Sequence, residues 1–295
     1  MAEGIKSQTG RAAGRGPWRD GRLLLSGSII LVAVAVAVLA PLLAQHDPYK
    51  VYPGQVLKGP SAQHWLGTDE LGRSTASRLL YGARASLQVA FFAVVIATVG
   101  GTGLGIASAY YGGLVDMVIM RAMDMVLCLP MMILVIATVA FVGNSVTNLI
   151  FVIGILYTPG TARIVYTTAL TIRQTQYVQA AQAIGAGARR VMLRHMLPNT
   201  IAPVLVHISL SLGFAILTET GLSFLGLGPP PPTATWGRMI AVGRTSVYRQ
   251  SLPLILPMLA VSTVILALTV LGDALRDVLD PRLRGSTTGK EQQRA

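Results

Sequence analysis

A polar, basic segment at 177–199 holds the residues whose types and spacing best suit a binding role. Its apolar side chains recur at helical spacing: Val178, Ala181, Ile184 and Ala188. The pattern predicts a short helix, a break at Gly185 and a second helical piece that Pro198 ends. The segment and its flank carry basic residues and no acidic one: Arg173, Arg189, Arg190 and Arg194. Such a helix pair between long apolar runs is suited to docking on a partner, not to bond-making chemistry.

Residue patterns for other kinds of chemistry are missing from the sequence. It contains no Gly-x-x-x-x-Gly-Lys-Ser/Thr loop, the pattern that cradles the phosphates of ATP. The single cysteine, Cys128, lies in an apolar run. The histidines are scattered without metal-ligand spacing: His46, His64, His195 and His207. We therefore expect no metal site, no resident cofactor and no enzymatic activity in this chain.

The elements that must position this segment are membrane spans. Hydrophobic residues make up 52% of the chain and charged residues 12%, against about 25% charged in soluble domains. Segments long enough to cross about 30 Å of hydrocarbon lie at roughly 23–44, 87–111, 122–143, 147–166, 199–222 and 251–273. The predicted fold class is an all-α integral membrane bundle of six transmembrane helices. The net charge of +12 falls between the apolar runs, which favours a role in orientation over nucleic-acid binding.

Charge also predicts how the chain lies in the membrane. The first apolar run follows basic residues, as a signal peptide would, but it is about twice as long as a signal core of about 7–15 residues. We therefore expect a retained anchor. With the N-terminus inside, 16 of the 24 lysines and arginines lie on the cytoplasmic side and eight outside. This favours N-in and C-in, with the 167–198 loop, between spans four and five, in the cytoplasm.

The expected organisation has five parts. They are a basic cytoplasmic N-terminus at 1–22, a first span at 23–44, an external loop at 45–86, a core of spans two to six at 87–276, and a cytoplasmic tail at 277–295.

Three motifs resemble one family of transport proteins. Ala180, Ala181 and Gly185, followed at the right distance by Leu197 and Pro198, resemble the EAA loop of permeases from binding-protein-dependent ABC importers. Two further stretches are similar to the C-type permeases of the dipeptide, oligopeptide and nickel branch. They are Trp65-Leu66-Gly67-Thr68-Asp69-Glu70-Leu71-Gly72-Arg73 and Glu219-Thr220-Gly221-Leu222-Ser223-Phe224-Leu225-Gly226-Leu227-Gly228. The resemblance covers about residues 20–285.

The resemblance implies a multi-pass cell-membrane protein that forms half of a pathway for di- or oligopeptides. Nickel or another small solute is the alternative within the branch. The implied partners are a homologous sister permease, two ATPase subunits that hold ATP and Mg²⁺, an external solute-binding protein and the lipid bilayer, with no nucleic acid. The implied coupling loop, which sits in a cleft of the ATPase, contains Gln179, Ala180, Ala181, Gly185, Arg189, Arg190, His195, Leu197 and Pro198. The family usually has Glu where this chain has Gln179, and a Gln can accept a hydrogen bond there but brings no charge for an ion pair.

Two further sets of residues have open interpretations. Glu219, near the outer end of the fifth span, either lines the translocation path beside a cationic peptide terminus, or reaches water or pairs with Arg238. The outer segment 64–86 either connects two spans or docks the external binding protein, through Arg73, Arg78 and Arg84.

Two other classes of function are considered. A proton-coupled secondary transporter would use Glu219 or Asp273 as a relay, but the sequence has no detectable inverted halves. A non-transporting membrane scaffold would bind its partner through 177–198, and an uptake assay separates it from a permease.

Overall fold

The computed structural model describes residues 21–279 of the 295-residue chain. Its α-helices are α1 (Gly21–Leu43), α2 (Thr75–Tyr111), α3 (Gly113–Leu127), α4 (Met131–Val142), α5 (Val146–Arg173), α6 (Gln176–Ala183), α7 (Ala188–Val191), α8 (Leu197–Phe224), α9 (Trp236–Gly243) and α10 (Leu252–Leu279). A short 3-10 turn covers Pro53–Gln55, and a π-helical turn covers Met192–Met196. The described residues contain no β-strand, so the predicted all-α class is confirmed.

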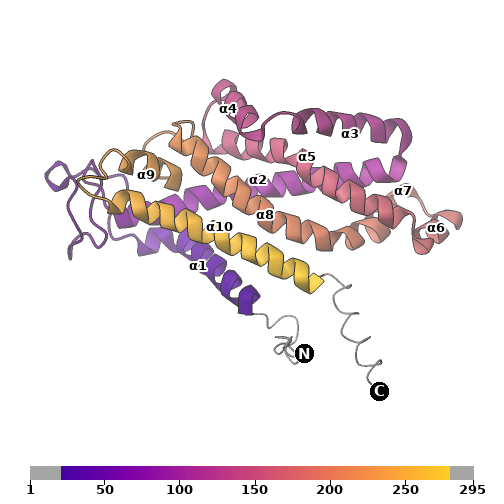
Figure 1. The fold of residues 1–295 in the computed structure, drawn as a ribbon, viewed down its shortest axis with the longest axis horizontal. Coiled ribbons are helices and arrows are strands. Elements are labelled where there is room, and N and C mark those ends of the chain that lie inside the picture. Colours follow the sequence, from indigo (N-terminus) through magenta and orange to yellow (C-terminus); the bar gives the residue numbers. More distant parts are fainter. Residues whose placement is uncertain (1–20, 280–295) are drawn as a thin grey trace, which may run out of the picture.

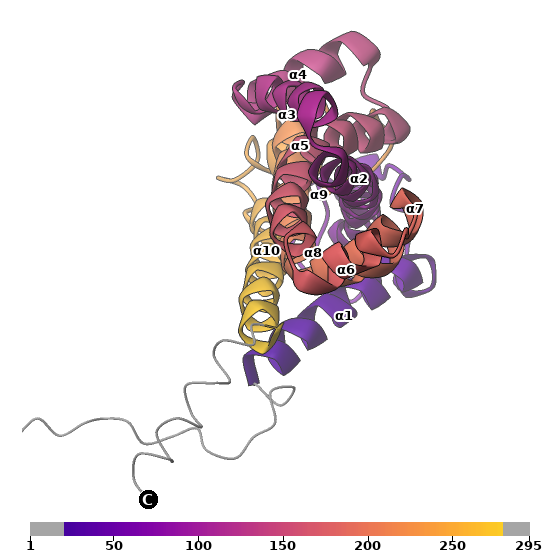
Figure 2. The same cartoon turned by 90° about the vertical axis from the view of Figure 1, so that its right-hand side faces the viewer.

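The long helices form one elongated bundle (Figure 1). α2 and α5 share the most extensive contact, α8 packs on α10, and α1 lies along α2 and α10. Segment 44–74 and α9 lie at one end of the bundle, which we call the α9 end. α6 and α7 lie at the opposite end, the α6 end, which faces the viewer in Figure 2.

Five described helices are long and apolar enough to cross a membrane, or six spans if α3 and α4 count as one. The expected third span at 122–143 is not a single helix, because α3 and α4 meet at 90°. Pro130 explains the break. A proline has no N–H for the helical ladder, and it disfavours helical geometry in the residue before it.

The α2–α5 contact depends on small residues. A Cβ atom on Gly101 would lie 2.6 Å from the Thr161 Cβ atom, and one on Gly105 would lie 2.6 Å from the Ala162 carbonyl oxygen. These glycines let the two backbones approach closely. Gly103 differs, because a Cβ atom there would meet nothing within 4 Å. One face of α2 is therefore used inside the chain, and another is open.

Bounds were also predicted for the segments outside the core, and the structure describes only some of these segments. The loop predicted at 45–86 is shorter in the structure, because α2 already starts at Thr75. Ser74 caps this helix, and its hydroxyl accepts a hydrogen bond from the Ser77 amide. The basic N-terminus predicted at 1–22 and the tail predicted at 277–295 lie almost wholly outside the described residues.

Candidate coupling site and the joint at the α9 end

The 177–198 segment has the predicted helix, glycine break and second helix. α6 ends in a Schellman motif, in which the Ala186 amide donates to the Ala181 carbonyl at 3.0 Å and the Gly185 amide donates to the Gln182 carbonyl at 3.0 Å. Gly185 has a φ of +82°, a left-handed conformation that favours glycine. The glycine is therefore required by the turn between α6 and α7.

The two faces of α6 have different roles. Val178 and Ala181 are buried, and Val178 belongs to a cluster that joins α6 to α2 and α5. Gln179 and Ala180 are exposed, and Ile184 is 86% exposed. Ala180 and Ala181 thus do different things, since only Ala180 is open to a partner. Ile184, directly after α6, is therefore an apolar side chain that the rest of the chain leaves uncovered.

The helix does not end at Pro198 as expected. α7, the π-helical turn and α8 form one continuous helical stretch, Ala188–Phe224. Pro198 has no N–H to donate, and the Leu197 amide donates to the Met192 carbonyl in the wider π pattern. Leu197 and Pro198 are therefore the start of α8, and the α6–α7 segment is directly continuous with a membrane-length helix.

The exposed surface of this segment is basic. Arg189, Arg190 and Arg194 are exposed, and none of them forms an ion pair within residues 21–279. Arg173 differs, because its Nη1 atom donates to the Ala109 carbonyl at 3.0 Å and ties α5 to α2. The His195 ring lies 6.4 Å from the Tyr177 ring.

Gln179 is held against the backbone. Its Nε2 atom donates to the Gln174 carbonyl at 3.2 Å, so the side chain lies along the start of α6.

Glu219 lies far from the coupling segment, near the α9 end. Its side chain is fully buried, and its Oε1 atom accepts a hydrogen bond of 2.6 Å from the Ser223 hydroxyl. Oε2 has no partner among the described residues, although the Ser86 and Thr235 hydroxyls also face this carboxyl. The expectation that Glu219 reaches water or pairs with Arg238 is wrong, since the side chain is buried and forms no ion pair within residues 21–279.

The surroundings of Glu219 form a tight joint between α2, α8 and α9. The Trp236 amide donates to the Ser86 hydroxyl at 3.3 Å, and its indole Nε1 donates to the Leu79 carbonyl at 3.1 Å. A Cβ atom on Gly237 would lie 2.3 Å from the Thr220 carbonyl oxygen. Ser86 is far from Trp236 and Gly237 in the chain, so only the packing of α9 on α2 brings them together.

Two of the three arginines proposed to dock a binding protein, Arg73 and Arg78, instead form contacts within segment 44–74 and the start of α2. Asp69 is buried, and its Oδ2 atom lies 2.8 Å from Arg73 Nε and 3.4 Å from Arg78 Nε. The Arg78 side chain is only 3% exposed and donates to the Pro48 carbonyl. Of the three arginines, only Arg84 is exposed.

No group of three or more histidine, cysteine or acidic side chains that could hold a metal occurs within residues 21–279.

The site residues predicted from the sequence fall into two separate places. The coupling residues lie on and around α6 and α7 at the α6 end (Figure 1). Glu219 lies in the last turns of α8, the helix that packs on α9.

Comparison with known proteins agrees with these features. Residues 101–285 match the family described as binding-protein-dependent transport system inner membrane component. A dipeptide transport system permease protein of Alkalihalophilus pseudofirmus is 38% identical over 276 residues, 91% of this chain and 91% of that protein. A glutathione transport system permease protein of Pectobacterium atrosepticum is 37% identical over 279 residues, 92% of this chain and 93% of that protein. The chain belongs to the family of binding-protein-dependent transport system inner membrane components, the membrane permeases of ABC importers, and is a multi-pass membrane protein.

Proposed function

We propose that this chain forms half of the translocation pathway of an ABC importer for di- or oligopeptides. Its implied partners are a sister permease, an external binding protein and two ATPase subunits that hydrolyse ATP. The names of its relatives support peptides as the substrate, since both dipeptides and glutathione are short peptides. The chain's own part is mechanical, and the ATP and Mg²⁺ belong to the partner subunits.

We infer that the α6 end is cytoplasmic, with both chain termini on that side. The charge distribution supports this orientation. Arg22, at the start of α1, also pairs with Asp277, near the end of α10, at 2.8 Å, so the two ends of the described chain lie together.

The observation that carries the proposal is the exposed Ile184 and the basic surface beside it, on a segment continuous with α8. An ATPase that moves this segment would move α8 directly, and the movement would reach the joint around Glu219 at the other end of the same helix. Alternating access would then follow from tilting α8 against α2 and α5.

The test is co-purification of the ATPase subunits with tagged permease from solubilised membranes. Ile184→Asp should abolish co-purification without changing the yield of permease. Tyr111→Asp is the matched control, because Tyr111 is a 54% exposed apolar side chain at the end of α2, outside the coupling segment. Equal ATPase recovery with both variants would refute the coupling role.

A further inference from the structure

A pair of opposite charges joins α3 to α5. The Arg163 Nη2 atom donates to the Asp124 Oδ1 atom, across 39 positions of the chain. The Arg163 side chain is 48% exposed and the Asp124 side chain is 29% exposed, so the pair lies on the surface of the chain. It belongs neither to the coupling segment nor to the joint around Glu219.

Arg163 lies at membrane depth. Thr161, two residues earlier on α5, packs on Gly101 of α2, where a Cβ atom would lie 2.6 Å from the Thr161 Cβ atom. The helical rise separates Gly101 from Tyr111, the last residue of α2, by about 15 Å. Tyrosines are typical of the membrane interface, and the hydrocarbon is about 30 Å thick. The guanidinium is therefore well inside the span.

A second set of contacts gives a similar depth for Asp124. The Ser108 hydroxyl donates to the Asp116 carboxyl at 2.6 Å and the Tyr166 hydroxyl donates to it at 2.8 Å, which holds the start of α3 beside the end of α2. From there α3 runs back toward the α9 end (Figure 1). Asp124 is eight residues further along α3, or about 12 Å deeper.

An exposed ion pair at this depth needs water or a polar ligand beside it. A guanidinium has five N–H donors, and within residues 21–279 the Arg163 guanidinium donates only to Asp124. The other donors would have no partner in lipid, where an unpaired polar group is costly. Charged side chains in spans almost always face the bundle interior or a water-filled cavity. The exposed side of this pair therefore faces water and not acyl chains.

The exposed surface of α5 changes along the helix in the same sense. In the half nearer its start, Phe151 and Ile155 are 53% and 60% exposed. In the half that leads to α6, the exposed residues are Arg163, Thr167 and Thr171, four positions apart and so on one side of the helix. A polar strip thus connects the ion pair to the α6 end, the cytoplasmic side in the orientation inferred above.

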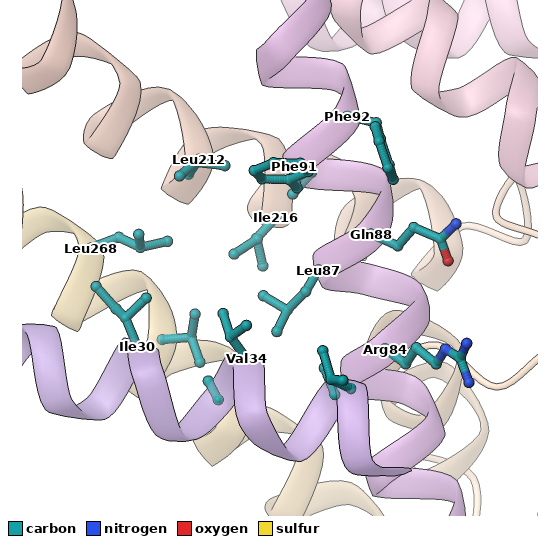
Figure 3. A pocket seen from close by; sticks show the side chains of 15 residues that line it. Ile30, Val34, Arg84, Leu87, Gln88, Phe91, Phe92, Leu212, Ile216 and Leu268 are labelled. Atoms are coloured by element: carbon teal, nitrogen blue, oxygen red, sulfur yellow. The ribbon is translucent and has the colours of Figure 1, made fainter. Parts of the chain in front are cut away.

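The opposite side of the bundle has no such polar strip. A cavity of about 470 Å³ lies there between α1, α2, α8 and α10, and its lining is apolar apart from Arg84 and Gln88. Figure 3 shows these two at its edge, whereas Ile30 and Leu87 point into it. Lipid tails can cover such a surface. α3 and α4 lie on the side away from α1 (Figures 1 and 2), so the ion pair and the apolar cavity are on different sides.

We propose that Asp124 and Arg163 line the translocation pathway and bind the charged ends of a peptide as it passes. A peptide with free termini carries an ammonium and a carboxylate, which complement the Asp124 carboxylate and the Arg163 guanidinium. In the empty pathway the two side chains pair with each other, so neither charge is left alone in the membrane. This rests on the proposed function, which supplies the peptide, and goes beyond it by naming residues that the substrate touches.

Thiol labelling tests whether this side of the bundle faces water. The exposed Cys128 is first removed by Cys128→Ser, and one new cysteine is introduced by Gly160→Cys or Gly103→Cys. Both glycines have open space at the Cβ position, and both lie within about one turn of the level of Gly101. Gly160 is one turn from Arg163, whereas Gly103 lines a mainly apolar hollow between α2 and α8.

The reagent is a charged, membrane-impermeant methanethiosulfonate, added to inside-out vesicles that contain the assembled transporter. Position 160 should react about ten times faster than position 103 or more, because a hydrated thiol ionises more readily than one in lipid. Equal or slower reaction at position 160 would overturn the proposal, whatever the state of the ATPase.

Neutralising the pair tests its contact with the substrate. The double variant Asp124→Asn, Arg163→Gln keeps polar side chains that can bond to each other. It should keep the melting temperature and the recovery of ATPase subunits. ATP-dependent dipeptide uptake should fall about tenfold or more, because neither end of the peptide meets an opposite charge.

The matched control is Arg22→Gln, Asp277→Asn, which neutralises an exposed pair at the ends of α1 and α10 and should leave uptake unchanged. Uptake at the wild-type rate by the Asp124, Arg163 double variant would overturn the proposal and leave the pair a structural link between α3 and α5. Absence of ATP-dependent uptake by the wild type would instead refute the proposed function.

Discussion

Glu219 and Ser223 lie one turn apart on α8, and the Ser223 hydroxyl donates to the Glu219 carboxyl at 2.6 Å inside the protein. The pair lies at the joint where α2, α8 and α9 meet. An acidic side chain in a span suggested a place on the substrate path, but this carboxyl is enclosed by its own chain. In this conformation the carboxyl is bonded within α8 and faces the Ser86 and Thr235 hydroxyls of the joint.

Substitutions at Glu219 should therefore affect stability more than transport. Glu219→Ala removes the acceptor of the Ser223 hydrogen bond and should cost about 1–3 kcal/mol of unfolding free energy. Glu219→Gln keeps an acceptor and should lose less. Thermal melting in detergent compares the two. If Glu219→Gln melts normally yet abolishes peptide uptake, the carboxyl charge acts in transport and the structural interpretation is insufficient.

Gly237 should tolerate no side chain. Its Cβ position lies 2.3 Å from the Thr220 carbonyl oxygen, so Gly237→Ala forces α9 away from α8 and should cost about 1–3 kcal/mol. Gly54→Ala serves as the control, because a Cβ atom at Gly54 meets nothing within 4 Å. The melting temperature should fall for the first variant alone. An equal response of the two variants would show that the joint is not tightly packed.

Asp69 should be essential for the segment between α1 and α2. Asp69→Asn leaves the buried Arg78 guanidinium without its carboxylate and should destabilise the segment by about 3–5 kcal/mol. Limited proteolysis of 44–74 measures this loss. Arg84→Gln should leave the segment resistant, because Arg84 is exposed and forms no ion pair within residues 21–279. Unchanged resistance of Asp69→Asn would contradict the assigned role of the carboxylate.

The same segment should weaken in acid. Burial lowers the pKa of His64 below its ordinary value of 6.5, and His46 and Lys58 lower it further. The unfolded segment therefore binds a proton more readily than the folded one, and stability is lost as the pH falls below about 6.5. The proteolysis rate of 44–74 should rise between pH 7 and about pH 5, and less so in His64→Gln. A rate independent of pH in the wild type would contradict this expectation.

Local patterns predicted local structure well. The helix–glycine–helix form of 177–191 followed from apolar spacing and Gly185. These features depend on residues that are near one another in sequence, or on a residue type that suits only one conformation.

Features that depend on distant contacts could not be predicted in this way. A proline interrupts the helical ladder, but the sequence does not say how the chain responds. Pro130 coincides with a 90° bend, whereas Pro198 lies within a continuous helical stretch. From the sequence alone, Arg78 is a cation in a loop between two spans. In the structure it is buried and contacts the Asp69 carboxylate and the Pro48 carbonyl. Likewise, the environment of Glu219 includes Ser86, which only the packing of α2 on α8 and α9 brings close.

The central claim is that ATPase subunits drive peptide movement through this chain. The most direct measurement is uptake of a labelled dipeptide by proteoliposomes that contain the purified permease pair, the ATPase subunits and the binding protein. We predict uptake that requires ATP and is abolished by Ile184→Asp, but not by Tyr111→Asp. Uptake that persists without ATPase subunits and follows an imposed proton gradient would contradict the account and identify a secondary transporter.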